Sequence, residues 1–235
     1  MLAAYYGYYY WDPTYILILI GVAISALASA RVRSTFNRYS RVRSASGMTG
    51  AQAAERILHN AGIYDVTIQH VSGNLTDHYD PRNKTLNLSD TVYASDSVAA
   101  VGVAAHECGH AIQHQVGYAP LNIRSMLVPI AQFGSGASWV FILLGIVLSM
   151  QPLLTVGILV FSFAVLFQIV TLPVEFNASS RALQALEAQH ILYGDEIKET
   201  RSVLSAAALT YVAGAAAAIL QLLRLIILFG GRRND

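Results

Sequence analysis

The stretch His106-Glu107-Cys108-Gly109-His110 lies within a segment of helical character. Residues four apart on an α-helix stand one above the other, about 6 Å apart along the axis. Both imidazoles can therefore face one metal ion while Glu107 stands beside them, an arrangement typical of zinc peptidases. Cys108 is turned away from this face and is predicted to be a buried thiol, since free cysteine packs as a small hydrophobic residue.

The helix that carries these residues has recognisable ends. Ser95 and Ser97 are candidate N-caps for a helix over about residues 98–116. Gly117 and the later Pro120 are typical of its end. The motif therefore lies on one regular helix.

The residues before this helix predict a small folded region. A capping box at 49–52 begins a helix over 53–60. Alternating apolar and polar residues at 66–71 and 85–88 predict strands, separated by turn residues. A sheet of two or three strands is expected beside the motif helix.

Outward from this region the chain becomes strongly apolar. Hydrophobic residues make up 54% of the 235 residues and charged residues only 12%, against about 25% in soluble proteins. Four blocks are long enough to cross a bilayer as helices: 14–30, 127–149, 153–174 and 203–229. Arg224 is their only Asp, Glu, Lys or Arg residue, and its side chain is expected to extend outward to the headgroups.

Charge around the first block predicts its orientation. Residues 1–13 contain no Lys or Arg, which argues against a secretory signal peptide. Five arginines follow the block: Arg31, Arg33, Arg38, Arg41 and Arg43. The positive-inside rule places them in the cytoplasm, and the aromatic residues at 5–11 at the outer interface. A net charge of +1 gives no indication of a nucleic-acid partner.

The predicted fold class is a mainly α membrane protein with about four transmembrane helices and a small α+β zincin-like cytoplasmic domain. The expected segments are the N-terminal tail and first span (1–30), the cytoplasmic zincin-like region (31–126), a transmembrane hairpin (127–174), a cytoplasmic helix (175–202), and the last span with its tail (203–235). The protein is thus expected to be a multi-pass protein of the cell membrane.

A catalytic zinc site needs a third protein ligand and an open position for water. The metzincin pattern would place a histidine at position 116, which is Val116, and a glycine where Gln113 stands, so that class is excluded. His114 lies two turns beyond His106, about 12 Å along the axis, too far for one ion on a straight helix. His114 is interpreted as a surface or supporting histidine.

The first carboxylate after Glu107 is Glu175. It follows Pro173 at the membrane boundary, where a lone carboxylate is costly without a partner. A zinc ion would be such a partner. The alternative is that Glu175 begins a helix and interacts favourably with its dipole.

Four sequence stretches add a resemblance to a known family: Asp-Pro-Thr-Tyr-Ile at 12–16, His-Tyr-Asp-Pro at 78–81, Ala-Ala-His-Glu at 104–107 and Leu-Pro-Val-Glu-Phe-Asn-Ala-Ser at 172–179. The chain resembles, over nearly all its length, the YugP-like family of neutral zinc metallopeptidases of bacterial membranes. More distantly it is similar to the gluzincin membrane proteases, such as HtpX and the CAAX prenyl proteases. The resemblance implies one zinc ion held by His106, His110 and Glu175, with Glu107 as the base.

One residue departs from these relatives. They place an aspartate four residues after the ligand glutamate, where it supports a metal-binding histidine, and this chain has Ser179. Support for the histidine is then weaker or comes from Asn177 or elsewhere. Arg181 and His78 are candidates for stabilising the oxyanion, or serve as structural ion-pair and turn residues.

The resulting hypothesis is a membrane zinc endopeptidase (hydrolase) whose active site faces the cytoplasm. Its substrates would be proteins or peptides, including membrane proteins in the bilayer, bound as an extended strand along the sheet edge. One alternative is a non-catalytic membrane scaffold or adaptor with a structural zinc site. A zinc transporter is disfavoured, because the candidate ligands flank the spans rather than lie within them.

Overall fold

Four long helices dominate the computed structural model, which describes residues 12–230. They are α1 (Tyr15–Tyr39), α4 (Ala119–Val147), α5 (Gln151–Ala188) and α6 (Asp195–Phe229). They run side by side, with α1 against α6, α6 against α5 and α5 against α4. All four are long and apolar enough to cross a membrane, and each corresponds to one of the four predicted apolar blocks.

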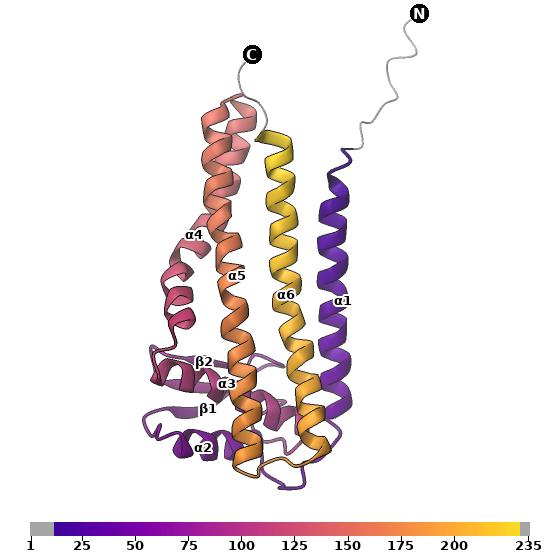
Figure 1. The fold of residues 1–235 in the computed structure, drawn as a ribbon, viewed down its shortest axis with the longest axis vertical. Helices are drawn as coiled ribbons and strands as arrows, with labels where there is room; N and C mark the ends of the chain where they lie inside the picture. Colours follow the sequence, from indigo (N-terminus) through magenta and orange to yellow (C-terminus); the bar gives the residue numbers. More distant parts are fainter. Residues whose placement is uncertain (1–11, 231–235) are drawn as a thin grey trace, which may run out of the picture.

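These helices continue beyond their apolar blocks at the end where the small sheet lies (Figure 1). The first block ends at residue 30, yet α1 runs to Tyr39 and carries Arg31, Arg33 and Arg38. Similarly, α4 begins at Ala119 and α6 at Asp195, eight residues before the block each contains. Helix propagation is cooperative and nothing in these stretches stops it. The long helices therefore also form part of the folded region that contains the sheet, beyond their apolar blocks.

The predicted helix over 175–202 is wrong. α5 runs through Pro173 to Ala188, residues 189–194 form a turn, and α6 starts at Asp195. Pro173 removes one N–H from the helix, but apolar helices packed among neighbours tolerate such a loss. The turn has Gly194 at a φ of 50°, and the acidic residues that begin α6 favour a helix N-terminus.

This correction also changes the interpretation of Glu175. It lies in the interior of α5, far from the helix start at Gln151. The dipole of a helix N-terminus acts only within about the first turn. The alternative that Glu175 only stabilises a helix start is therefore wrong.

The small α/β region contains α2 (Gly50–Asn60), β1 (Thr67–Val71), β2 (His78–Asp80), β3 (Thr85–Ser89) and α3 (Val98–Gln115). The predicted capping box is present between Thr49 and Gln52, and Ser97 caps α3. The strand order is β1-β3-β2, with β1 parallel and β2 antiparallel to β3. The predicted small sheet is thus confirmed, with three strands.

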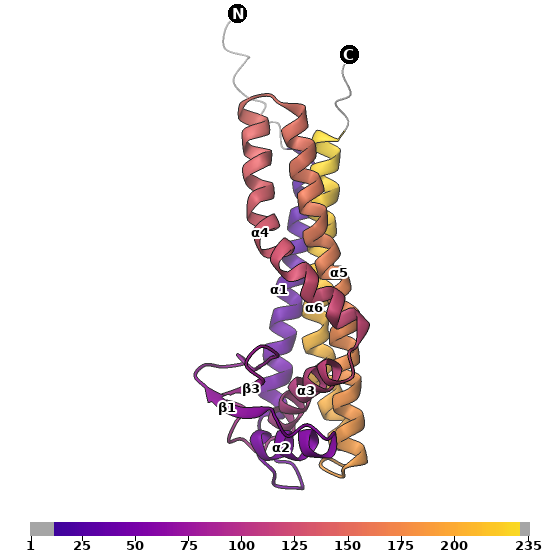
Figure 2. The same ribbon diagram turned by 90° about the vertical axis from the view of Figure 1, so that its left-hand side faces the viewer.

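The core of this region joins the sheet to the long helices. Its fully buried side chains include Ile57 of α2, Leu86 of β3 and Val101 of α3, together with Leu186 of α5. Cys108 is also buried here, and burial raises the pKa of its thiol. The prediction of a plain buried thiol is confirmed. Figure 2 shows the sheet on one side of α3 and the inclined first part of α4 on the other.

The opposite end of the bundle brings together the start of α1, the turn between α4 and α5, and the end of α6 (Figure 2). Gln151 donates a hydrogen bond to the carbonyl of Phe229. Arg224 does not simply extend to the surface as expected. It pairs with Asp12 at 3.2 Å and lies over the ring of Tyr15. The aromatic residues 5–11 and the tail after residue 230 lie outside the described residues.

Candidate metal centre

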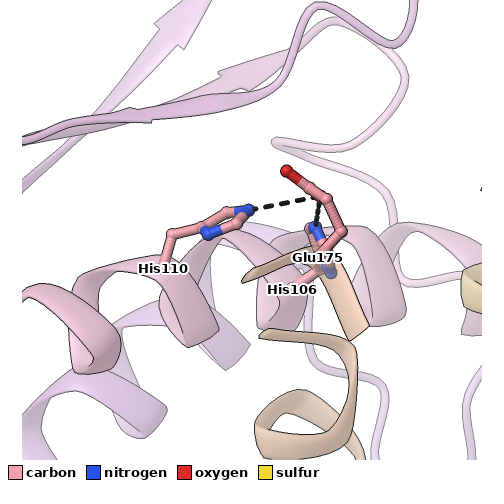
Figure 3. A group of neighbouring side chains, drawn as sticks. All are labelled: His106, His110 and Glu175. Atoms are coloured by element: carbon pink, nitrogen blue, oxygen red, sulfur yellow. Dashed lines mark hydrogen bonds and ion pairs between the residues drawn. The ribbon is translucent and has the colours of Figure 1, made fainter. Parts of the chain in front are cut away.

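His106 and His110 lie one turn apart on α3 and direct their rings toward Glu175 of α5 (Figure 3). Glu175 Oε2 is 3.3 Å from Nε2 of His106 and 3.6 Å from Nε2 of His110. The glutamate is only 2% exposed. His106 and Glu175 are 69 residues apart in the sequence. The contact between α3 and α5 therefore brings three potential metal ligands together.

Gly109 allows α5 to come close enough for this. A Cβ atom at position 109 would lie 2.5 Å from the carbonyl oxygen of Ala178, which is backbone and cannot easily move. Ala178 is itself fully buried. The glycine between the two histidines is thus a packing requirement of the α3–α5 contact, which sets the distance from α3 to Glu175.

The donor set fits a zinc ion. Tetrahedral zinc with ligands at about 2.0–2.1 Å separates neighbouring donor atoms by about 3.3 Å, close to the two distances measured from Glu175. The candidate ligand atoms of the three residues all lie within 4.8 Å of one another. Two imidazoles and one carboxylate are also a common ligand set of catalytic zinc, which keeps a fourth position for water. These residues would hold the ion.

The electrostatics of the site also favour a cation. Burial disfavours a proton on His110, but the nearby carboxylates of Glu175 and Glu107 outweigh burial and raise the pKa of His110. The same two negative charges would favour a divalent cation between the histidines. Glu175, being buried, would otherwise be a costly charge.

Gln113 fixes which nitrogen of His110 is available to a metal. Its amide nitrogen donates to the carbonyl of Val174 at 2.8 Å and to Oδ1 of Asn177 at 3.0 Å. Its oxygen must then accept the bond with His110 Nδ1, at 3.0 Å. Nδ1 of His110 therefore carries a proton, which leaves Nε2, the nitrogen nearer Glu175, as the one that can bind a metal.

We expect Gln113→Leu to weaken zinc binding by about 10–100-fold, the usual effect of losing an outer partner of a ligand. The leucine would leave the His110 ring without its acceptor and the Val174 carbonyl without its side-chain donor, and Asn177 would keep only the hydrogen bond from Arg181. Zinc affinity is measured by competition with a chromogenic chelator. Gln115→Leu, at an exposed position of the same helix, is the matched control. Equal affinity in wild type and Gln113→Leu would contradict the proposed orientation of His110.

His106 has a different supporting partner. Ser179 Oγ lies 3.1 Å from Nδ1 of His106, so the serine stands where the distant relatives are expected to use an aspartate. Asn177 acts on the other histidine instead, through Gln113. Arg181 donates to Asn177 Oδ1 at 2.8 Å, and so takes part in this polar chain rather than facing the histidines.

Glu107 lies beside the three potential ligands and is 8% exposed. Its Oε2 accepts a hydrogen bond of 3.0 Å from the backbone N–H of Tyr79 in β2. This contact holds the carboxylate between the motif helix and the edge of the sheet. Glu107 is thus oriented without contributing to the group of three.

A cavity of about 630 Å³ opens beside the site. His110 and Glu175 line it together with Tyr211 of α6 and Arg124 of α4. His114 also lines the cavity, where its Nδ1 lies 3.0 Å from the Tyr79 hydroxyl. It does not join the three potential ligands.

His78 lies at the rim of the same cavity. Its Nδ1 lies 2.9 Å from the carbonyl of Thr76, and its Nε2 lies 3.2 Å from Asn87. Both ring nitrogens therefore have partners within the sheet region. These contacts fit the structural alternative for His78 better than a role at the oxyanion.

Comparison with known proteins agrees with this geometry. The family model described as "Putative neutral zinc metallopeptidase" matches residues 14–230. The chain belongs to this family. It is also 44% identical over 219 residues to "Putative membrane protease YugP" of Bacillus subtilis (strain 168), covering 93% of this chain and 97% of that protein. No solved structure matches the chain. The resemblance noted from the four sequence stretches is confirmed.

Some residues around the candidate zinc site of this chain were not found from the sequence. Gln113 could have been recognised, because it lies three residues after His110 and so shares its helix face. No sequence pattern pointed to three other groups, which are the backbone N–H of Tyr79 and the side chains of Tyr211 and Arg124. Each belongs to an element whose position relative to α3 is determined only by the fold.

Proposed function

We propose that the chain is a zinc-dependent membrane endopeptidase that hydrolyses peptide bonds with one catalytic zinc ion. The observation that carries this proposal is the approach of Glu175 to both His106 and His110, at 3.3 and 3.6 Å. A buried carboxylate brought against a two-histidine motif from another helix supports a three-ligand catalytic site of the gluzincin type. The family membership supports the same activity.

The proposed mechanism assigns one task to each residue. When bound, zinc would polarise the scissile carbonyl and lower the pKa of a coordinated water to about 7. Glu107 takes the proton from the attacking water and passes it to the leaving amine. The backbone N–H of Tyr79 orients Glu107 for this transfer. Ser179 and Gln113 hold the two histidine rings in place.

The sheet edge offers a place for substrate. β2 pairs with β3 on one side only, and on its other side it approaches α3 through Tyr79 and Glu107. We propose that a protein or peptide substrate, including segments of membrane proteins, adds to this edge as an extended strand. Main-chain hydrogen bonds would then place a peptide bond next to Glu107.

We propose that the site faces the cytoplasm, close to the lipid boundary. Arg31, Arg33 and Arg38 lie on the final turns of α1, at the end of the bundle that carries the sheet and α3. The positive-inside rule assigns this end to the cytoplasm. With four spans, the start of α1 and the end of α6 would then both lie on the outer side of the membrane.

Removal of the metal tests the proposed function. We expect the purified full chain in detergent to cleave casein, to lose this activity in 1,10-phenanthroline, and to regain it when zinc is restored after the chelator is removed. Magnesium added in place of zinc is the control, since it prefers oxygen ligands and water. A membrane scaffold with structural zinc would bind the metal but cleave nothing. Cleavage that persists without metal would contradict the proposal.

A further inference from the structure

Arg124 is a charged side chain in the cavity with an unsatisfied buried atom. In residues 12–230, three buried side-chain polar atoms have no hydrogen-bond partner, and Nε of Arg124 is the only one that carries a charge. The arginines that form ion pairs in this part of the chain are Arg43 and Arg224. A buried guanidinium N–H without an acceptor is costly, and an anionic molecule bound in the cavity would supply that acceptor.

Arg124 and two of the potential metal ligands line the same cavity. Arg124 lies in the second turn of α4, and the two ligands are His110 and Glu175. Tyr211 of α6 lines this cavity as well. A molecule that fills this cavity would therefore border both the candidate metal centre and Arg124.

The local carboxylates already have other partners. Glu175 contacts both histidines, and Glu107 accepts from Tyr79. Arg82 is the other arginine at the cavity, but its side chain is exposed to water. Arg124 is thus the arginine of this cavity that has a buried donor without an acceptor.

We infer that Arg124 is a specificity residue that binds a carboxylate of the peptide substrate near the scissile bond. Guanidinium matches carboxylate with two parallel hydrogen bonds, which gives direction as well as charge. For an endopeptidase the carboxylate comes from a substrate Asp or Glu side chain; a C-terminal carboxylate has the same chemistry, but its recognition would mean that the site removes residues from the C-terminus. The inference rests on the proposed function, since it names the substrate class of the same site.

The test uses quenched fluorescent peptides with one common sequence. One pair differs by Glu or Gln beside the scissile bond, and another by a C-terminal acid or amide. We expect wild type to prefer the anionic member of at least one pair by about 10-fold, mainly through KM, as a charged hydrogen bond would give. In Arg124→Gln the ratio should fall to about 1, and Arg124→Lys should recover part of it. Arg201→Gln, an exposed arginine on α6 outside the cavity, should keep the ratio.

Binding provides a readout that is independent of turnover. The same peptides are titrated by fluorescence anisotropy against zinc-loaded Glu107→Gln, with and without Arg124→Gln. The ratio of the two dissociation constants should again fall to about 1 when Arg124 is replaced. The affected pair, Glu against Gln or acid against amide, identifies the source of the carboxylate.

Several outcomes would overturn the inference. One is that Arg124→Gln leaves both ratios at the wild-type value; another is that wild type shows no preference within either pair. A defect of Arg124→Gln seen in phosphatidylglycerol vesicles but not in phosphatidylcholine vesicles would assign the arginine to a lipid headgroup instead. Zinc-loaded wild type that neither binds nor cleaves any peptide would overturn the proposed function, and this inference with it.

Discussion

Replacing Glu107 by glutamine should lower the rate of peptide hydrolysis by about 10²–10⁴-fold, the usual contribution of a general base. Glutamine has nearly the same shape and can still accept the hydrogen bond from the Tyr79 N–H. It cannot, however, take a proton from water. The expected loss therefore lies in kcat, with KM little changed, and is measured with a quenched peptide in detergent.

The metal content of the same variant separates catalysis from folding. Glu107 is not among the three potential ligands, so Glu107→Gln should bind about one zinc ion per chain, as wild type should. Glu55→Gln, at an exposed position of α2, is the matched control and should keep full activity. Unchanged hydrolysis by Glu107→Gln would show that another group acts as the base.

Replacing Glu175 by glutamine should have the largest effect on metal binding. A neutral amide is a poor zinc ligand, and the substitution removes the negative charge that faces His106 and His110. We expect zinc affinity to fall by more than about 100-fold, beyond the usual effect of losing an outer partner. Hydrolysis should fall with it at limiting zinc. Chelator competition measures the affinity.

Glu187→Gln is the control for this substitution, because Glu187 lies on the same helix but is exposed. Circular dichroism of the metal-free proteins shows whether Glu175→Gln folds as wild type does. A correctly folded Glu175→Gln protein with wild-type zinc affinity would rule out Glu175 as the third ligand.

Most of the architecture could be predicted from local patterns. The four apolar helices follow from their length and composition, and α2 and α3 from their capping residues Thr49 and Ser97. The interior of α5 could not be predicted in this way. Pro173 is typical of a helix boundary, but here it lies in the middle of one 38-residue helix, because packing in the bundle outweighs the local preference.

The candidate site shows the same division between local and tertiary information. The spacing of His106 and His110 on one helix is a local property, and the long stretch without acidic residues drew attention to Glu175. The distance from Glu175 to the histidines depends on close packing at Gly109 and Ala178. The same packing places Gln113 against Val174 and Asn177. Contacts between helices that are distant in the sequence cannot be predicted from the periodic pattern of either helix.

The most direct test of the account is the position of zinc in a crystal of Glu107→Gln, located by anomalous scattering at the zinc absorption edge. We predict a single peak, coordinated by Nε2 of His106, Nε2 of His110 and the carboxylate of Glu175, at about 2.0–2.2 Å from each. A peak between the two histidines with a different third protein ligand, or zinc bound at another place in the chain, would contradict it.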